Sequence, residues 1–375
     1  MRVSIVAPVD PLVERPGGTR NYVMNLVRNL KASGIEFSLI GVDYDQTDGP
    51  ADFDFIPAVV APRVSSVRFL RGLMKTSKKT DFSSDTIIHA QRPDYLFPFI
   101  FRKHRNKMLC TLHGQMLRSI MHRKGGFFGT GYRLLESYAM KGADHVIAVD
   151  QSTLDLFNSK YPFLVPRSSL IPVGIDLKSW GREDRDSLRL KLGLQPHGKT
   201  MLYVGRLEKE KNVNLIINSF QIVRKEVHDC SLVIVGDGTQ RKDLERFAGQ
   251  EGGDGVRFMG SQPSEVVRDY LAASDVLCLA SSFESGPLVV LESLASGTPV
   301  VSTEVGQVRR FLQNTATGMI VPRDGEAMAD GVIDMFNIER EEISPRCIAR
   351  AGEFSFKKTF ESTLGVYEGL RLLSE

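Results

Sequence analysis

In residues 283–307, FESGPLVVLESLASGTPVVSTEVGQ, the carboxylates Glu284 and Glu292 are eight positions apart. The intervening Ser-Gly-Pro favours the start of a helix with proline in its first turn. Eight positions along a helix span about 12 Å. The two acids are therefore too far apart to act as one general acid and base pair, but they are spaced to bind opposite ends of one extended ligand. The alternative is a capped helix with two solvated acids.

A second candidate set is basic. Arg206 and Lys211 lie in VGRLEKEKNVN, between an apolar strand pattern and a helical pattern. Two cations at the end of a strand are suited to neutralising a diphosphate and the charge that it develops as a leaving group. A solvated loop is the alternative, and the intervening Glu208 and Glu210 are typical of one.

His113 ends the apolar strand KMLCTL and precedes a glycine. Residues at the carboxyl end of a strand often face a ligand in α/β proteins. The ring could donate a hydrogen bond to a sugar hydroxyl or a phosphate. A structural role is the alternative, and a lone histidine at a strand end more often has that role.

Two glycine-containing turns are candidates for phosphate contact. Gly17 and Gly18 lie between the first strand and the first helix, where adjacent glycines let backbone N–H groups approach an anion. The second turn, GDGTQR from Gly236 to Arg241, has arginine where a dinucleotide fingerprint needs glycine or alanine. This weakens a nicotinamide or flavin interpretation. Each turn has an ordinary βα turn as its alternative.

Short β-rich apolar runs alternate with longer amphipathic stretches along the whole chain, which predicts βαβ units and parallel sheets. The expected strands of the first half are VSIVAP, FSLIGV, TIIHA, KMLCTLH, HVIAVD and SLIPV, and those of the second half are MLYVGRL, SLVIVGDG, GVRFMGS, DVLCLAS, PVVSTEVG and GMIVPRD. Helices are expected near Thr19, Pro93 and Tyr132 in the first half, and at NVNLIINSFQIVRKEV and SEVVRDYLAA in the second.

Between the two series, the segment from Pro172 to Arg185 is rich in glycine, proline and charge and is interpreted as a linker. Two doubly wound α/β domains follow from this pattern. Because ligands bind at the carboxyl ends of parallel strands, we expect the site in a cleft between the domains.

Length and composition agree with this organisation. The chain has 375 residues, 42% hydrophobic and 25% charged, which suits two globular domains and excludes a collagen, coiled-coil or disordered chain. No apolar run approaches the ~20 residues that span a bilayer, and Met1 leads directly into the strand-like RVSIVAP rather than a secretory leader. We expect a cytoplasmic protein.

Four scattered cysteines, without a CxxC pair or histidines at metal-ligand spacing, predict buried, reduced thiols and no metal site. They are Cys110, Cys230, Cys278 and Cys347.

The net charge of +3 is unevenly distributed. Residues 1–170 carry 23 basic against 15 acidic residues, and the remainder carries 25 against 30. The basic set is Arg63, Arg68, Arg71, Lys75, Lys78, Lys79, Arg102, Lys103, Arg105, Lys107, Arg118, Arg123 and Lys124, interleaved with Val67, Phe69, Leu70, Leu73, Phe127 and Phe128. This mixture favours peripheral contact with anionic lipid on the inner membrane face, or with a phosphate-bearing acceptor. A solvated face is the alternative; nucleic acid is not expected, because no recognised binding module appears.

Together these segments resemble the retaining glycosyltransferases of the GT-B fold, in particular family 4 (glycosyl transferases group 1), which transfers hexoses from nucleotide sugars. The matching pieces are PGGTRNYVMNL, TLHG, PVGID, VGRLEKEKNV, VIVGDG, ESGPLVVLE and SLASGTPVVSTEVGQ, so the resemblance covers nearly the whole chain. The ending EFSFKKTFESTLGVYEGL is similar to the family's terminal helix.

The resemblance implies two Rossmann-like domains facing across a cleft. An acceptor-side domain would comprise residues 1–173 and a nucleotide-sugar-binding domain residues 174–354. Residues 355–375 would form a terminal helix that crosses back to the first domain.

The resemblance also implies roles for the candidate residues. Arg206 and Lys211 would pair with the diphosphate of a UDP- or GDP-hexose. Glu284 would hold the hexose and Glu292 the ribose hydroxyls, while His113 would face the transferred sugar from the other domain.

Further donor contacts are implied for glycine-rich and backbone segments. They are Gly17 and Gly18 at the diphosphate, Ser285, Gly286, Pro287 and Leu288 at the sugar and phosphate, and Met259, Gly260 and Ser261 at the nucleobase.

Two positions depart from the commoner family wording. Asn212 stands where glycine is usual after the motif lysine, and Gly286-Pro287-Leu288 replaces the more frequent Phe-Gly-Leu. Because the second change lies in the loop under the donor sugar, the hexose is not inferred.

The resemblance implies retention of anomeric configuration. No carboxylate stands out as a nucleophile, so we favour a front-face route in which the departing diphosphate, stabilised by Arg206 and Lys211, helps to deprotonate the acceptor. This scheme requires no metal or other cofactor, and no DxD cluster stands out. Domain closure about a hinge near Gly174 would bring His113 to the donor.

The first functional hypothesis is therefore hexose transfer to a glycan or lipid-linked acceptor, in cell-surface or membrane glycoconjugate synthesis. One alternative is a soluble transferase that acts on a small molecule or storage glycan. Another is a non-catalytic nucleotide-sugar-binding scaffold, and an oxidoreductase is disfavoured by the missing third glycine of the GDGTQR turn.

Overall fold

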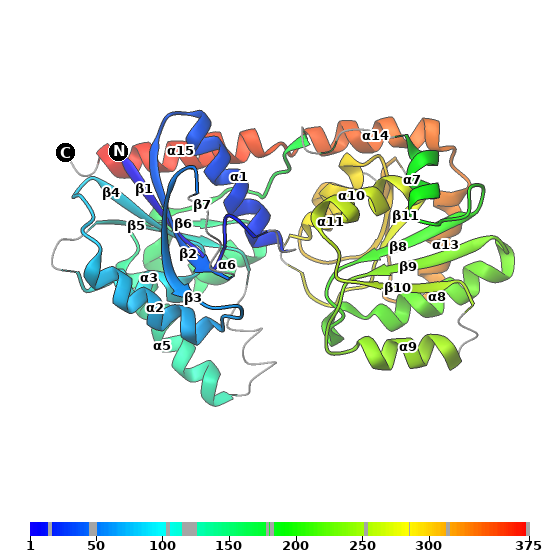
Figure 1. The fold of residues 1–375 in the computed structure, drawn as a ribbon, viewed down its shortest axis with the longest axis horizontal. Coiled ribbons are helices and arrows are strands. Elements are labelled where there is room, and N and C mark those ends of the chain that lie inside the picture. The colour runs from blue at the N-terminus through cyan, green and yellow to red at the C-terminus, as the bar shows by residue number, and fades with distance from the viewer. Residues whose placement is uncertain are drawn as a thin grey trace. The chain divides into compact units, whose positions relative to one another are not determined.

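The structure is a computed structural model that describes residues 1–13, 17–44, 51–102, 106–114, 126–177, 180, 184–250, 254–284, 286–312 and 316–372. The chain forms two compact units (Figure 1). Unit 1 comprises Met1–Val173 and Phe356–Glu375, and unit 2 comprises Gly174–Ser355. Each is an α/β unit with a parallel sheet covered by helices, which confirms the predicted fold class.

Unit 1 contains a seven-stranded sheet in the order β3-β2-β1-β4-β5-β6-β7. Every strand pair in it is parallel. The strands are β1 (Arg2–Val6), β2 (Glu36–Asp43), β3 (Asp54–Val60), β4 (Thr86–Ala90), β5 (Lys107–Leu112), β6 (His145–Ala148) and β7 (Ser168–Leu170).

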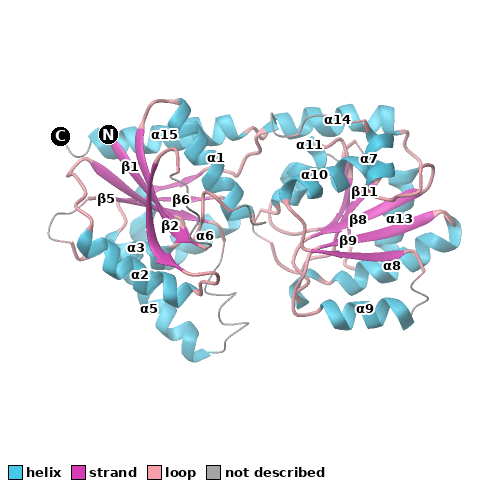
Figure 2. Ribbon diagram, in the orientation of Figure 1, coloured by secondary structure: helices cyan, strands magenta, loops and turns pink. Residues whose placement is uncertain are grey.

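The helices of unit 1 cover both faces of this sheet (Figure 2). The terminal helix packs beside the first helix on one face, and the second, third and fifth helices pack together on the other. The helices are α1 (Gly18–Ala32), α2 (Ser66–Lys79), α3 (Pro93–Ile100), α5 (Gly126–Gly142), α6 (Gln151–Lys160), the short 3₁₀ helix η1 (Pro162–Arg167) and α15 (Phe356–Leu372).

Unit 2 contains a six-stranded parallel sheet in the order β10-β9-β8-β11-β12-β13. Its strands are β8 (Lys199–Val204), β9 (Cys230–Val235), β10 (Val256–Gly260), β11 (Val276–Leu279), β12 (Val300–Thr303) and β13 (Gly318–Val321). Its helices are α7 (Arg185–Lys191), η3 (Lys209–Lys211), α8 (Val213–Glu226), α9 (Arg241–Gln250), α10 (Ser264–Ala273), α11 (Leu288–Ala295), α12 (Val308–Phe311), α13 (Gly325–Phe336) and α14 (Arg340–Gly352).

The sequence pattern explains why these strands form. Each central strand is a short run of apolar residues because it is buried on both faces, as parallel sheets require. All five residues of β4, TIIHA, are buried, and so are all four of β11. Helix α1 ends at Ser33 and Gly34, and Gly34 has the left-handed φ of 64° that favours glycine.

Four elements of unit 1 were not predicted: β3, α2, α6 and η1. Strand β3 contains Pro57, which lacks a backbone N–H and fits only an edge strand, and β3 is indeed at the edge of the sheet. Helix α2 follows it and carries the basic residues that were interpreted only as a surface. Helix α5 begins before the predicted start at Tyr132.

The chain passes between the units at Val173–Gly174 and again at Ser355–Phe356. Within unit 2 the two passages are joined, because Ile175 N donates to Phe354 O at 2.8 Å and Ile175 forms a parallel bridge with Ser355. The first passage lies in the segment predicted as a linker. All four cysteines are buried free thiols, as predicted.

Candidate donor site and unit 1 residues

The order of strands in unit 2 reverses at β8, whose neighbours are β9 on one side and β11 on the other. The loops after β8 and β11 therefore leave the sheet in different directions, and such a point is where parallel sheets bind ligands. Arg206 and Lys211 follow β8, and Glu284 follows β11. Three of the predicted residues thus lie on the two loops that flank this point.

Lys211 and Glu284 form an ion pair between Nζ and Oε1, although they are 73 positions apart in the sequence. The Ser281 hydroxyl also donates to Glu284 Oε1, at 3.1 Å. Only 13% of the lysine side chain and 19% of the glutamate side chain is exposed. Because partly buried charges are costly without a partner, each group stabilises the other.

The loop that carries Lys211 is held against the loop after β11. Asn212 has φ 48° and ψ 42°, a left-handed conformation that asparagine tolerates better than most residues with a Cβ. Its Nδ2 donates to Ala280 O at 3.1 Å, and Ser282 N donates to Glu210 O at 2.8 Å. The left-handed turn explains why asparagine can replace glycine here, and the amide adds a bond between the loops that glycine lacks.

Arg206 does not join the Lys211–Glu284 pair. Its side chain is 57% exposed, and its Nη2 lies 3.7 Å from Glu210 Oε1. The backbone at this position is anchored to β8, because the Tyr203 hydroxyl donates to Arg206 O at 2.9 Å. Burial raises the pKa of Tyr203, so the hydroxyl keeps its proton and remains a donor.

The GDGTQR turn packs directly on the backbone of the loop after β8. A Cβ on Gly236 would lie 1.8 Å from Gly205 O, and one on Gly238 would lie 2.3 Å from Leu207 O. Leu207 N also donates to Asp237 O at 2.9 Å. Close backbone packing therefore accounts for both glycines without a ligand.

The helix predicted near Glu284 begins later than expected. Helix α11 starts at Leu288 with Pro287 as its N-cap, so Glu284 lies in the preceding loop and the helical spacing between the two acids is wrong. No side chain caps α11 and its first turn contains no acid, so its free N–H groups favour an anion. Glu292 lies within α11 and is partly exposed; Ser285 is outside the described residues.

Met259 and Gly260 end β10, at the same edge of the sheet. Gly260 has φ 69°, and a Cβ built there would lie 3.1 Å from Arg241 Nη1. Arg241 also pairs with Asp237, at 3.3 Å. Arg241 was not predicted to contact this loop, because only the folded sheet brings α9 beside the end of β10.

In unit 1 the strand order reverses at β1, between β2 and β4. Gly17 is the N-cap of α1, and neither a capping side chain nor an acid occupies the first turn. A Cβ on Gly17 would have no atom within 4 Å, so the position is open. His113 follows β5, is partly exposed, and its Nε2 lies 2.8 Å from Gln91 Oε1.

A second histidine was missed by the sequence analysis. His89 is fully buried in β4, with Nδ1 2.7 Å from the Tyr367 hydroxyl of α15 and Nε2 2.7 Å from Thr111 Oγ1. Loss of water lowers the pKa of His89 to about 3, with a smaller contribution from nearby His113. It thus joins the sheet to the terminal helix as a neutral side chain.

Two further findings bear on partners. Among the described residues, no three His, Cys, Asp or Glu side chains are arranged to hold a metal ion. Within the same part of the chain, no helix is long and apolar enough to cross a bilayer.

Comparison with known proteins then gives the family. Residues 184–353 match "Glycosyl transferases group 1" and residues 16–179 match "Glycosyltransferase Family 4". The fold and these matches define a glycosyltransferase of the GT-B class. The chain belongs to the group 1, family 4-like glycosyltransferases.

The alpha-monoglucosyldiacylglycerol synthase of Streptococcus pneumoniae is 40% identical over 42% of this chain and 37% of its own length. The D-inositol 3-phosphate glycosyltransferase of Paenarthrobacter aurescens is 29% identical over 62% of this chain and 59% of its own length. The chain thus spans less than two thirds of either relative. The structure of Anabaena Alr3699/HepE in complex with UDP-glucose is similar in fold, with a TM-score of 0.77, 18% identity and 99% of each chain covered.

Proposed function

We propose that the protein is a retaining hexosyltransferase that uses a nucleoside-diphosphate hexose as donor. The observation that carries this proposal is the Lys211–Glu284 pair at the point where the unit 2 sheet reverses. It supplies a cation for a diphosphate and a carboxylate for sugar hydroxyls within one ion pair. The similarity to a protein crystallised with UDP-glucose supports a nucleotide-sugar donor, UDP- or GDP-linked.

In this proposal a bound donor separates the pair. Lys211 then turns to the diphosphate, together with Arg206, whose exposed guanidinium has only a 3.7 Å contact to Glu210 to give up. Glu284 keeps the Ser281 hydroxyl and accepts from the hexose hydroxyls in place of the ammonium. The charges that hold the empty loops together are thus the ones that recognise the donor.

Backbone groups complete the proposed donor site. The backbone N–H groups of Gly286 and Leu288, on either side of Pro287 at the start of α11, face sugar and phosphate, and Glu292 binds the ribose. Met259 and Gly260 contact the nucleobase. In unit 1, Gly17 and Gly18 approach the diphosphate with backbone N–H groups, and His113 contacts the transferred hexose.

The proposed reaction proceeds on one face of the sugar. The bond from the anomeric carbon to the diphosphate oxygen breaks, and the acceptor oxygen bonds to the same face, which retains the configuration. The acceptor proton passes to the departing diphosphate oxygen. Lys211, Arg206 and the α11 amides stabilise the charge on the leaving group, so the scheme uses no metal or other cofactor.

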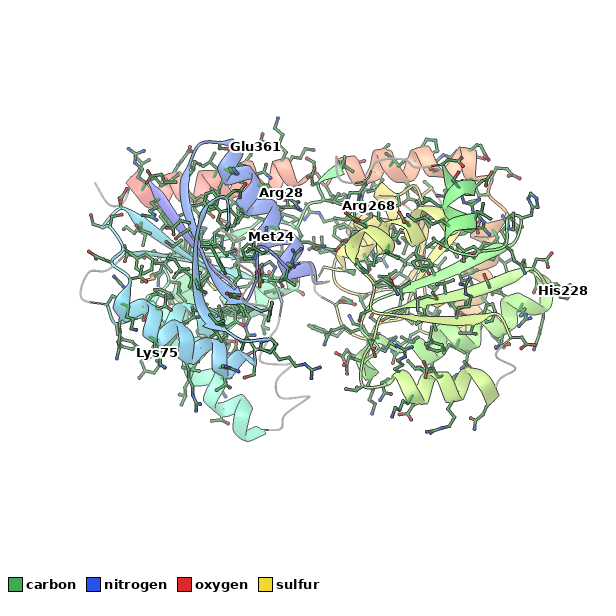
Figure 3. The ribbon with its side chains drawn as sticks, viewed as in Figure 1. Met24, Arg28, Lys75, His228, Arg268 and Glu361 are labelled. Carbon is green, nitrogen blue, oxygen red and sulfur yellow. The ribbon has the colours of Figure 1, made fainter. Side chains whose placement is uncertain are left out.

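We further propose a glycan or lipid-linked acceptor reached from an anionic membrane surface. Helix α2 presents Arg68, Arg71 and Lys75 to solvent beside exposed Val67 and Met74. Figure 3 labels Lys75 on the outer side of α2. A basic face with apolar residues is suited to anionic headgroups. The predicted basic residues Lys103, Arg105, Arg118, Arg123 and Lys124, and the side chains of Phe127 and Phe128, are outside the described residues.

The test is a calorimetric titration with UDP, GDP, ADP and their hexose conjugates, with and without Mg²⁺. Tight binding of one nucleoside diphosphate and release of free hexose or product from its conjugate are expected. Binding without any turnover across a broad acceptor panel would instead favour a non-catalytic scaffold. Failure to float with anionic vesicles would favour a soluble acceptor.

The donor assignment is tested further by Glu292→Ala. Loss of two hydrogen bonds to ribose should weaken donor binding roughly tenfold, about 1.4 kcal/mol, with little change in kcat. Glu226→Ala, an exposed acid at the end of α8, is the matched control. An unchanged donor titration for Glu292→Ala would remove the ribose role.

A further inference from the structure

Gln91 lies at the point where the strand order of unit 1 reverses. It directly follows β4, which pairs with β1, and its backbone N donates to Val6 O at 3.0 Å. Its side chain has no exposed surface. The backbone bond anchors the residue beside β1, and its amide group is buried.

The amide oxygen of Gln91 determines which nitrogen of His113 carries the proton. Gln91 Oε1 lies 2.8 Å from His113 Nε2 and can only accept. With Oε1 toward the ring, Nε2 is the protonated nitrogen, and a neutral ring then has an acceptor lone pair at Nδ1. None of the described residues donates to Nδ1.

The ring is held in place by a second contact. Tyr22 of α1 packs edge-on against it, with ring centroids 4.8 Å apart and planes at 77°. Among the residues that the structure describes, the titratable groups facing the ring are Tyr22 and, from β4, His89. Burial raises the pKa of Tyr22 and lowers that of His89 to about 3, so both are neutral at pH 7. Burial also lowers the pKa of His113 to about 4.

We propose that Gln91 is a positioning residue that holds His113 in its Nε2-protonated form, so that Nδ1 accepts a hydrogen bond from a substrate hydroxyl. The proposal rests on the proposed function, in which His113 contacts the transferred hexose. It changes the expected role of His113 from hydrogen-bond donor to hydrogen-bond acceptor. A charged ring would have a proton on both nitrogens and could not accept.

The first experiment measures the ring itself. The full chain is labelled with ¹⁵N-histidine, and the long-range ¹H–¹⁵N spectrum of His113 is followed from pH 7.5 to pH 5, with His113→Ala to assign the signals. The expected result is a protonated Nε2 and an unprotonated Nδ1 throughout. A ring protonated at Nδ1 at pH 7.5, or charged by pH 6, would overturn the proposal whatever the protein catalyses.

The second experiment compares Gln91→Leu with Gln91→Glu in donor turnover. The leucine variant removes the acceptor and should lower kcat about tenfold with little change in KM. The glutamate variant still accepts from Nε2 but stabilises a charged ring and so raises the pKa of His113. The turnover rate of this variant should fall at acid pH values, over a range in which the wild-type rate does not change with pH.

The loss of activity at low pH in Gln91→Glu must disappear when His113→Ala is added to it. His145→Ala is the matched control, since His145 lies at the opposite end of a strand in the same sheet and contacts Ser169 at 2.8 Å. A glutamate variant with the wild-type pH profile would overturn the positioning role. Full activity of His113→Ala would refute the proposed function of His113, and the ¹⁵N spectrum would still decide the role of Gln91.

Discussion

The two sheets of this protein reverse their strand order in the same way but place opposite kinds of chemistry at the reversal. In unit 2, between β8 and β11, an ammonium and a carboxylate meet. In unit 1, the reversal lies between β1 and β4. The side chains there are the amide of Gln91, directly after β4, and its partner His113, which follows the next strand, β5, and which burial keeps neutral.

The difference matches what each side of a sugar transfer has to bind. A diphosphate leaving group needs fixed positive charge, whereas hexose and acceptor hydroxyls need neutral donors and acceptors. The same topology thus provides the position, and the residue types at the strand ends provide the specificity.

Removing the cation from unit 2 should have the largest effect. Lys211→Ala should lower donor turnover about 10³-fold, since an interaction with leaving-group charge is lost. Lys209→Ala, from an exposed lysine in the same loop, should stay within twofold. If Lys211→Ala keeps its turnover within tenfold of the wild type and its melting temperature is unchanged, the charge at the unit 2 reversal does not have the proposed catalytic role.

Charge reversal on α2 tests whether the basic residues of this helix bind an anionic membrane surface. Replacing Arg68, Arg71 and Lys75 with Glu should weaken binding to vesicles rich in anionic lipid by at least roughly 3 kcal/mol, at about 1 kcal/mol for each basic residue. The control reverses three exposed basic residues of unit 2, Lys225, Lys242 and Arg246. Equal flotation of both triple variants would rule out α2 as the contact.

Because His89 and His113 are buried in their neutral form, we expect the stability of unit 1 to decrease at acid pH. The pKa of His89 is about 3 in the folded protein and about 6.5 when unfolded, so below pH 6.5 the unfolded chain binds a proton that the folded chain does not. Stability is therefore full above pH 6.5 and declines as the pH falls toward 3.

At pH 5 the loss from His89 should be about 2 kcal/mol. Urea unfolding at pH 7.5 and pH 5 measures it, and His89→Gln should reduce the difference by that amount. An identical pH dependence in the variant would show that His89 is not the group responsible.

The smallest effect concerns the loop that supports Lys211. Asn212→Ala should cost about 1 to 2 kcal/mol, since alanine is strained at φ 48° and the bond to Ala280 is lost. Asn212→Gly should cost less, because glycine adopts this conformation freely. The free energies of unfolding in urea compare the two variants. A glycine variant that is less stable than the alanine variant would contradict the backbone explanation.

Most of the fold could be predicted because buried parallel strands are visible as short apolar runs. Strand β3 was missed since Pro57 interrupts its pattern, which only an edge strand tolerates. The start of α11 was placed too early because Ser-Gly-Pro is compatible with either a first turn or the residues before it.

The sequence predicted individual residues of the candidate site but not which of them contact one another. Lys211 and Glu284 each follow a strand, but nothing local indicates that they pair, because the strand order is a property of the folded sheet. Gln91 carries no charge and so was not singled out. Its position directly after the buried run TIIHA was the one signal in the sequence that pointed to it.

The return of α15 to unit 1 has a consequence for biosynthesis. Unit 2 is an uninterrupted stretch of chain inserted into unit 1, whose last element packs Phe356 against Tyr22 and Tyr367 against His89. As the chain leaves the ribosome, unit 2 has all its residues before unit 1 does. Strand β1 is thus translated before unit 2, although it belongs to the unit that is completed after unit 2.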